Sequence, residues 1–394
     1  MTREELTQEF LSSTTKNFVL QLPTSYGKSK LALQKVNTWY NKDCKILIVI
    51  PRVVLIKGWE DEIKKWSYNH LLPNVTFTTY VSLHKHCDEY WDAVIFDEGH
   101  HTSEKCRETM SALRFKHFIV LSATLKKEHL DFFRRYEVKI FHVKVKDAIE
   151  NEILPDPKII LIPLALDNRR NDYAIAKNFK KGVNASPLTI DYSSKWKYRT
   201  YKGPLLIRCT QRQYYNDLSG LIDWYKERGK HNAIMKNMWL HKAGERLKWL
   251  ALQKETISKE LLSALRNFRT LVFCPSIEDS IGIGSPCINS KVGTENLTRF
   301  NEKKIKHIAA VGMLDEGCNL TDCKVGIFKM INSSDRLNIQ RQGRLLRHKS
   351  PVLIFPYFVD TREQEIIDEI IKDYNPELIT KLNVLSVKDI KNYL

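Results

Sequence analysis

Residues 17–29, Asn-Phe-Val-Leu-Gln-Leu-Pro-Thr-Ser-Tyr-Gly-Lys-Ser, decide the fold class of this chain of 394 residues. The apolar run 17–22 predicts a short buried strand, and a helical pattern follows the loop that ends in Lys28 and Ser29. A strand, a tight loop and a helix in this order form a phosphate-binding loop, because the loop amides and the helix N-terminus point at phosphate oxygens. The stretch therefore predicts an α/β fold with a nucleotide site.

The loop side chains have separate expected tasks. Gly27 permits the tight turn, Lys28 places a cation on the β and γ phosphates of ATP, and the Ser29 hydroxyl can bind Mg²⁺. Leu22 stands where such loops usually have a first glycine, so a chance Gly-Lys-Ser at a helix start is the alternative. The residues predicted to bind ATP through this loop are Thr24, Ser25, Tyr26, Gly27, Lys28 and Ser29.

Three further apolar runs, 45–50, 92–96 and 118–121, favour a parallel sheet that is buried on both faces. Polar residues follow their carboxyl ends, where open α/β sheets bind ligands. Asp97 is placed to hold Mg²⁺, and Glu98 is placed to polarise the attacking water. The alternative is that both carboxylates only cap the next helix, which the phosphate loop upstream disfavours.

The second half of the chain predicts another α/β unit, with strands at 269–274, 306–311 and 324–330. Its sequence contains no second phosphate loop with a lysine. Arg344 and Arg347 are three residues apart in a predicted helix and share a face, and two guanidinium groups suit a triphosphate. The second unit is therefore expected to supply arginine fingers to the nucleotide site of the first, with a solvated basic helix as the alternative.

Four motifs in a fixed order resemble those of superfamily 2 helicases: Pro-Thr-Ser-Tyr-Gly-Lys-Ser, Asp-Glu-Gly-His-His, Ser-Ala-Thr and Gln-Arg-Gln-Gly-Arg-Leu-Leu-Arg. Among these helicases, the chain looks most like phage UvsW-type DNA helicases and related restriction-motor ATPases, which share the Asp-Glu-x-His-His box. The resemblance covers about residues 1–125 and 266–360. It implies two RecA-like lobes with parallel sheets that hydrolyse ATP with Mg²⁺ and move on nucleic acid.

The resemblance also implies roles for individual residues, and these are expectations for the structure. The catalytic set is Lys28, Asp97, Glu98, Gln340, Arg344 and Arg347. The residues that couple nucleotide and nucleic-acid contacts are His100, Ser122, Thr124, Glu316 and Gly317. The residues expected to contact nucleic acid in the lobes are Pro51, Arg52, Thr79, Ser82, Ser276 and Asn319. Arg3 and Gln8 are the candidates for reading adenine, although their spacing departs from the family.

The formal net charge of +17 makes polyanions the expected partner class. No apolar run approaches the length of a membrane span, and the first residues lack the pattern of a secretion signal. The eight cysteines include no Cys-x-x-Cys, which disfavours a zinc site or a disulfide framework. Reduced thiols, a cytoplasmic location in a prokaryotic host cell and a monomeric chain are expected.

The middle of the chain, 167–254, carries 19 Lys and Arg against seven Asp and Glu, together with twelve aromatic residues. Within it, 187–208 alternates basic and aromatic residues and predicts a β-hairpin. Two readings of this hairpin stay open: a nucleic-acid grip, or a small aromatic core with solvated lysines. Amphipathic helices are expected at 211–227 and 236–255, with their aromatic residues in the core. The hairpin residues expected to bind nucleic acid are Lys195, Trp196, Lys197 and Arg199.

The expected organisation is a first lobe at 1–165, a basic accessory insertion at 166–265 that is mostly helical, and a second lobe at 266–394. The expected function is an ATP-dependent helicase or translocase on single-stranded, forked or branched DNA in replication, recombination or repair, encoded by a phage. Three alternatives remain: a helicase for RNA or RNA–DNA hybrids, a motor for a partner nuclease, and an inactive scaffold. The intact catalytic set disfavours the scaffold.

Overall fold

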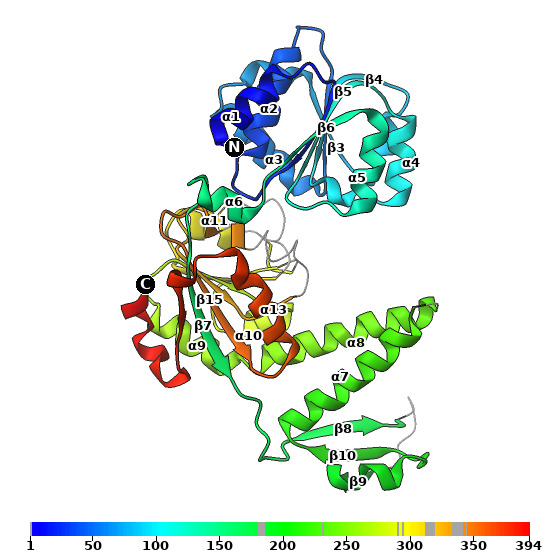
Figure 1. Ribbon diagram of the computed structural model, residues 1–394, viewed down its shortest axis with the longest axis vertical. Coiled ribbons are helices and arrows are strands. Elements are labelled where there is room, and N and C mark those ends of the chain that lie inside the picture. The colour runs from blue at the N-terminus through cyan, green and yellow to red at the C-terminus, as the bar shows by residue number, and fades with distance from the viewer. Residues whose placement is uncertain are drawn as a thin grey trace.

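The computed structural model describes residues 2–179, 186–230, 232–289, 291–293, 295–311, 320–332, 342–343 and 345–394. These residues form two large sheets and one three-stranded sheet. Figure 1 shows the first large sheet at the top, the second below it, and the small sheet set apart with two long helices. Glu316, Gly317, Asn319, Gln340 and Arg344, which the sequence analysis singled out, lie outside the described residues.

The first lobe is built on a six-stranded parallel sheet with strand order β3-β2-β4-β5-β1-β6. Its strands are β1 (Asn17–Gln21), β2 (Ile46–Ile50), β3 (Val75–Thr79), β4 (Tyr90–Asp97), β5 (Arg114–Ser122) and β6 (Val138–His142). Its helices are α1 (Arg3–Ser12), α2 (Lys28–Trp39), α3 (Ile56–Lys65), α4 (Glu104–Ala112), α5 (Lys127–Phe133) and α6 (Val145–Glu150). The predicted apolar strands are confirmed. Helices cover both faces of the sheet, which explains why these strands are apolar throughout (Figure 1).

One core of this lobe joins α1 and α2 to β1. The rings of Phe10 and Phe18 meet edge to face, with their centroids 4.9 Å apart. Lys35 is buried beside them and donates from Nζ to the carbonyl oxygens of Leu11 and Ser13, each at 2.8 Å. These two bonds tie the carboxyl end of α1 to the helix that follows the phosphate loop.

The second lobe is built on a seven-stranded sheet with order β12-β13-β11-β14-β15-β7-β16. Its strands are β7 (Lys158–Leu164), β11 (Thr270–Phe273), β12 (Cys287–Ile288), β13 (His307–Ala310), β14 (Val325–Phe328), β15 (Val352–Phe358) and β16 (Ile379–Lys381). Its helices are α9 (Glu255–Ala264), α10 (Ile277–Gly282), α11 (Glu295–Asn301) and α13 (Arg362–Ile370). The paired strands are parallel, as the sequence predicted.

The strand β7 does not close the first lobe, although the sequence analysis assigned residues 1–165 to it. It lies in the second sheet between β15 and β16, where Ile160 pairs with Ile354. Ile159 contributes to the core on one face of that sheet, and Ile160 contributes to the core on the other. The assignment was wrong because an apolar run predicts a strand buried on both faces without indicating which sheet it joins.

The accessory insertion leaves the second lobe after β7 and returns to it at α9. It contains β8 (Tyr173–Lys177), β9 (Leu188–Asp191), β10 (Leu205–Cys209), α7 (Gln211–Arg228) and α8 (Ala233–Leu252). The prediction of two long helices is confirmed. The predicted β-hairpin at 187–208 is wrong, because β9 and β10 are parallel and the 3-10 helix η6 (Tyr192–Tyr198) joins them. The side chain of Lys195, in η6, pairs with Asp217 of α7, so this basic run folds onto a helix.

The turn between β15 and α13, together with the first residues of α13, holds the insertion at two places. At the start of α7, Arg212 donates to the carbonyl oxygen of Asp360 at 2.9 Å, and the Arg362 amide donates to the Tyr215 hydroxyl at 2.8 Å. After α8, Lys254 forms a buried ion pair of 2.5 Å with Glu363. The insertion is therefore attached to the second lobe at the start of α7 and again just after α8.

No helix among the described residues has the length and apolar character needed to cross a membrane. The seven described cysteines are free thiols, and six of them are buried. Burial raises the pKa of buried thiols such as Cys106, to about 11, which keeps them protonated. Cys318 lies outside the described residues.

Candidate nucleotide site at the meeting of the two lobes

A pocket of about 480 Å³ lies between the phosphate loop, the carboxyl end of β4 and the second lobe. Its lining joins Lys28 to Asp97 and Glu98 of the first lobe and to Arg347 of the second. Four of the predicted catalytic residues thus meet in one place, although they are far apart in the sequence. The other loop residues that line the pocket are Thr24, Ser25, Gly27 and Ser29.

The loop has the backbone geometry that a phosphate site requires. Gly27 precedes α2 with φ of 100°, a left-handed conformation that side chains disfavour. A Cβ at Gly27 would also lie 2.6 Å from a guanidinium nitrogen of Arg3. The Nζ atom of Lys28 donates to the carbonyl oxygens of Leu22 and Pro23, at 3.0 and 3.1 Å. These bonds hold the ammonium group against the loop that would surround a phosphate.

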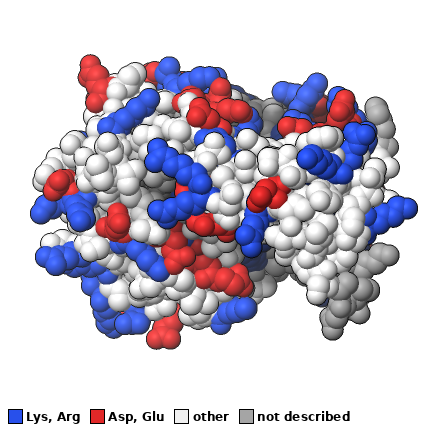
Figure 2. Space-filling view, turned by 90° about the horizontal axis from the view of Figure 1, so that it is seen from below, with Lys and Arg blue, Asp and Glu red and all other residues white. Residues whose placement is uncertain are grey.

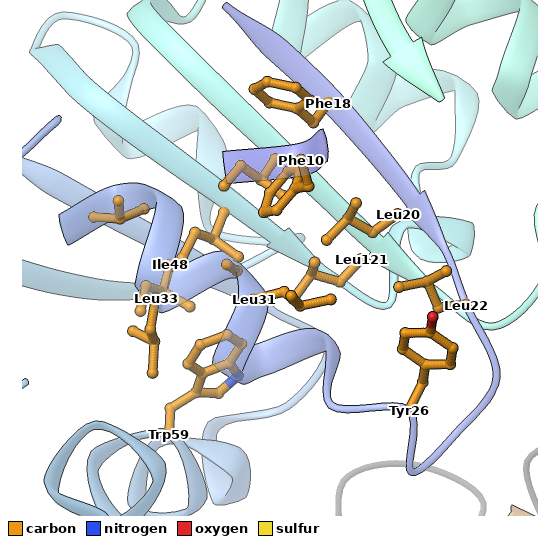
Figure 3. Packing of buried hydrophobic residues seen from close by; sticks show 14 of the residues in the cluster. Phe10, Phe18, Leu20, Leu22, Tyr26, Leu31, Leu33, Ile48, Trp59 and Leu121 are labelled. Carbon is orange, nitrogen blue, oxygen red and sulfur yellow. The ribbon is translucent and has the colours of Figure 1, made fainter. Parts of the chain in front are cut away.

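The side chain of Tyr26, one of the predicted ATP-binding residues, does not line this pocket. Its ring is wholly buried in the core of the first lobe and lies beside Leu22 (Figure 3). Burial raises the pKa of its hydroxyl. The buried Tyr26 ring therefore attaches the phosphate loop to the core of the first lobe.

The Asp97 carboxylate lies at the end of β4 and accepts a hydrogen bond from Trp59 Nε1 at 2.9 Å. Burial and the neighbouring charge of Glu98 raise the pKa of Asp97 to about 6, and the Trp59 bond and Lys28 lower it. The neighbouring groups therefore compensate the negative charge of Asp97 only in part, which suits the binding of a divalent cation. The oxygen donors present here, from Asp97 and from the Ser29 hydroxyl, are of the type that Mg²⁺ prefers.

A chain of polar contacts runs from Glu98 into the neighbouring strand. Nδ1 of His100 lies 3.4 Å from a carboxylate oxygen of Glu98 and 3.3 Å from the Ser122 hydroxyl. That hydroxyl donates to the carbonyl oxygen of Thr124 at 2.8 Å. Ser122 and Thr124, which were expected with His100 to couple the two kinds of contact, are therefore connected to Glu98 through His100.

The second lobe contacts the first lobe at the phosphate loop through Gly343, Leu346 and Arg347. The Ser25 hydroxyl donates to the carbonyl oxygen of Gly343 at 2.7 Å, and Nε of Arg347 donates to the same hydroxyl at 3.1 Å. Leu346 is buried in the core of the first lobe. The predicted meeting of Lys28 with a second-lobe arginine is thus present for Arg347.

The two residues proposed to read adenine lie next to this pocket. Arg3 lines it and also lines an adjoining pocket of about 660 Å³ beside α1. Gln8 lines only the adjoining pocket, which it shares with Lys30 and Gln34. The helix α1 therefore places both residues where a base could lie next to the phosphate loop.

The residues expected to grip nucleic acid in the first lobe lie at one edge of its sheet. Pro51 and Arg52 follow β2, and Thr79 ends the adjacent strand β3. The Thr79 hydroxyl accepts a hydrogen bond from the Ser82 amide at 3.3 Å. Arg52 is exposed at this edge. The four residues are therefore brought together by strand pairing.

The other nucleic-acid candidates are divided between the second lobe and the insertion. The Ser276 hydroxyl accepts a hydrogen bond from the Asp279 amide, at 3.2 Å, and so caps α10. Trp196 is 67% exposed and lies near Lys197, whose Nζ atom is 5.8 Å from the ring centroid. Arg199 is also exposed. Basic and acidic side chains are interspersed on the face seen in Figure 2, so basic residues do not form a single uniform patch there.

Sequence reasoning missed the contribution of α3 to the nucleotide pocket. Trp59, Glu62 and Trp66 line it, and the Trp66 Nε1 atom donates to Glu62 at 2.7 Å. Nζ of Lys30 lies 4.1 Å from the centroid of the Trp66 ring. Trp59 and Trp66 are seven residues apart, about two helical turns, so their spacing in the sequence predicts a common helix face.

Comparison with known proteins gives a family match for the first lobe. Residues 3–127 match the family described as type III restriction enzyme, res subunit. The chain is also 22% identical over 361 residues to the DNA 3'-5' translocase XPB2 of Sulfurisphaera tokodaii, covering 85% of this chain and 75% of that protein. The family match includes the phosphate loop and the carboxylate pair of the first lobe.

Two solved structures share the fold of the whole chain. Dbp5 of S. cerevisiae bound to RNA and ADP BeF3 has a TM-score of 0.63 and 9% identity, covering 100% of this chain and 93% of that chain. The type ISP restriction-modification enzyme LlaBIII bound to DNA has a TM-score of 0.56 and 12% identity, covering 99% of this chain and 32% of that chain. The first lobe is therefore similar to the res subunits of type III restriction enzymes, and the whole chain shares its two-lobed fold with Dbp5 and LlaBIII.

Proposed function

We propose that this protein is an ATP-driven DNA helicase or translocase that steps along nucleic acid as its two lobes close and open around ATP. One observation carries the proposal: Lys28 of the first lobe and Arg347 of the second line the same pocket. Each cationic group alone would be weak evidence for a nucleotide site. Their convergence beside two carboxylates is the arrangement that hydrolysis of a triphosphate requires.

The individual roles follow from the geometry. Lys28 would exchange its two carbonyl partners for phosphate oxygens, and Arg347 would stabilise charge that develops on the γ-phosphoryl group. Glu98 would orient the attacking water. Asp97 and Ser29 would hold Mg²⁺, which when bound neutralises charge on the β and γ phosphates. Arg3 and Gln8 would contact the base in the adjoining pocket.

The nucleic acid would run over the edge formed by the ends of β2 and β3 and would contact the insertion. Because Arg212 and Lys254 anchor the insertion to the second lobe, it would move with that lobe during each closure. Such a motor tracks the phosphate backbone, which predicts little base specificity and a steep dependence on salt. The exposed Trp196 offers a face on which an unpaired base could stack.

DNA is the substrate that the comparisons favour, because the curated relative is described as a DNA translocase and LlaBIII was solved with DNA. Dbp5, which was solved with RNA, makes RNA or RNA–DNA hybrids the second candidate. We further propose a UvsW-like role on forked or branched DNA in a phage-infected prokaryotic cell. The Asp-Glu-x-His-His box supports that role, and the buried free thiols suit the reducing cytoplasm.

The test is ATP hydrolysis by the whole chain with single-stranded DNA, forked DNA and RNA, each at several salt concentrations. DNA should stimulate hydrolysis more than RNA, and Lys28→Ala should abolish it while DNA affinity stays nearly unchanged. Strong residual hydrolysis in Lys28→Ala would remove the assignment of the ATP site. Strand displacement on forks, Holliday junctions, displacement loops and RNA–DNA hybrids then identifies the preferred substrate.

A further inference from the structure

The Ser25 hydroxyl connects the phosphate loop to two positions of the second lobe. It donates to the Gly343 carbonyl oxygen at 2.7 Å and accepts from Arg347 Nε at 3.1 Å. Gly343 and Arg347 are four residues apart in the same segment. A single hydroxyl on the first lobe therefore contacts both the backbone at Gly343 and the guanidinium group of Arg347.

The backbone of Ser25 indicates that a side chain is needed here. Its φ is 72°, in the left-handed region that glycine adopts at little cost and that most other residues avoid. Glycine would satisfy the turn, and phosphate-binding loops commonly use it. A serine in this conformation is accounted for by the two hydrogen bonds that only its hydroxyl can supply.

The contact between the lobes does not depend on Ser25 alone. Leu346 is buried in the core of the first lobe. Gly343 lies so close to Thr24 that a Cβ on the glycine would be 2.4 Å from the threonine Cβ. Because this packing remains without the Ser25 hydroxyl, removing the hydroxyl should release the orientation of Arg347 more than the contact itself.

We propose that Ser25 is a positioning residue that aims Arg347 into the nucleotide pocket. The inference rests on the proposed function, in which Arg347 contacts the γ-phosphoryl group. A guanidinium group carries five N–H donors in a rigid planar fork, and the bond to Ser25 uses one of them at Nε. Fixing Nε sets the plane of the fork, so the terminal nitrogens are oriented before the transition state forms.

The central variant is Ser25→Gly, which removes the hydroxyl and suits the positive φ. It should lower kcat for DNA-stimulated ATP hydrolysis by roughly 10- to 100-fold, the scale expected for a misplaced catalytic group. KM for ATP should change by less than about threefold, because Lys28 and the loop amides still bind the phosphates. Ser67→Gly is the matched control, since Ser67 is an exposed serine with φ of 63° outside the pocket. An unchanged kcat in Ser25→Gly would overturn the proposal.

A double-mutant cycle separates positioning from general damage to the loop. In an Arg347→Ala background, Ser25→Gly should cause no further loss of kcat, because the group that it positions is absent. Equal losses in both backgrounds would show that Ser25 acts independently of Arg347, and the proposal would be wrong. The parent protein and Arg347→Ala also test the proposed function, which fails if the arginine substitution leaves ATP hydrolysis intact.

Hydrogen exchange provides a readout that does not require ATP hydrolysis. In the nucleotide-free protein, Ser25→Gly should speed amide exchange in residues 345–347, while Ser67→Gly should leave it unchanged. Equal protection in Ser25→Gly and the parent would contradict the proposed role of Ser25, whatever reaction the protein catalyses. The proposal about Ser25 can therefore fail while the proposed function stands, and the reverse also holds.

Discussion

Trp59 donates a hydrogen bond from its indole nitrogen to the Asp97 carboxylate, across 2.9 Å. The bond joins α3 to the end of β4, so a helix outside the recognised motifs orients the carboxylate expected to hold Mg²⁺. It also lowers the pKa of Asp97, against the burial and the Glu98 charge that raise it. Trp59 is itself 4% exposed, so packing as well as the hydrogen bond fixes its position.

Replacing Trp59 by phenylalanine should weaken the use of Mg²⁺ without unfolding the lobe. The substitution keeps most of the buried aromatic surface and removes the donor, so the Asp97 pKa should rise further. Loss of a group that hydrogen-bonds to a metal ligand typically weakens metal affinity by roughly 10- to 100-fold. Mg²⁺ titrations of ATP hydrolysis at pH 7 measure the effect. Trp66→Phe is the control, because the Trp66 indole donates its hydrogen bond to Glu62 and not to Asp97. Equal Mg²⁺ affinities in the two variants would contradict the prediction.

The raised pKa of Asp97 predicts that the difference in stability between the parent protein and Asp97→Asn depends on pH. A carboxyl group with a pKa near 6 in the folded protein, against 3.8 as its ordinary value, binds a proton more readily when folded. Its contribution to stability therefore falls as pH rises from about 4 to 6 and stays unfavourable above that. Without Mg²⁺, Asp97→Asn should raise Tm relative to the parent more at pH 7.5 than at pH 5. Thermal unfolding at both pH values checks this, and a pH-independent difference would contradict it.

Replacing Glu98 by glutamine should separate nucleotide binding from hydrolysis. Glutamine keeps the size of the side chain but cannot polarise water as a base, so kcat should fall by about 10²- to 10⁴-fold. Affinity for ATP should stay close to that of the parent, because Lys28 and the loop are unchanged. Equilibrium binding and single-turnover hydrolysis measure the two effects. Glu62→Gln is a control in the same pocket, and normal turnover in Glu98→Gln would show that another group acts as the base.

The double substitution Trp196→Ala and Lys197→Ala should impair unwinding of forked DNA more than ATP hydrolysis stimulated by single-stranded DNA. Loss of one stacked base costs about 1–3 kcal/mol of binding by alanine substitution. Trp224→Ala is the comparison, because Trp224 is another exposed aromatic residue of the insertion, at 43%. Unchanged unwinding in the double variant would leave this aromatic stretch with a packing role only.

The buried Lys254–Glu363 pair should show non-additive effects on stability. Lys254→Met leaves the Glu363 carboxylate buried without its cation, which typically costs about 3–5 kcal/mol. Lys254→Met combined with Glu363→Gln removes both charges and should recover much of that loss. Chemical unfolding of the parent, Lys254→Met, Glu363→Gln and the double variant measures the coupling. Strictly additive losses would show that the two groups do not depend on each other.

The sequence by itself determined the local elements around the nucleotide pocket. The run before Pro23 formed a strand, the loop to Ser29 formed a tight turn, and the residues after Asp97 lay at the end of a strand. These features depend on burial periodicity and turn chemistry over a few residues. Such information is present in any short window of the sequence, which explains why four strands of the first sheet and three of the second could be predicted.

Only the tertiary structure decided which distant residues meet. The run 158–164 pairs in the second sheet, the basic stretch at 192–198 folds as a 3-10 helix, and Trp59 reaches Asp97. Ser25 likewise meets Arg347 across the two lobes. An apolar run records that its side chains are buried, but it does not record the partner that buries them. That choice depends on long-range packing and on the loop closures that bring separate segments together.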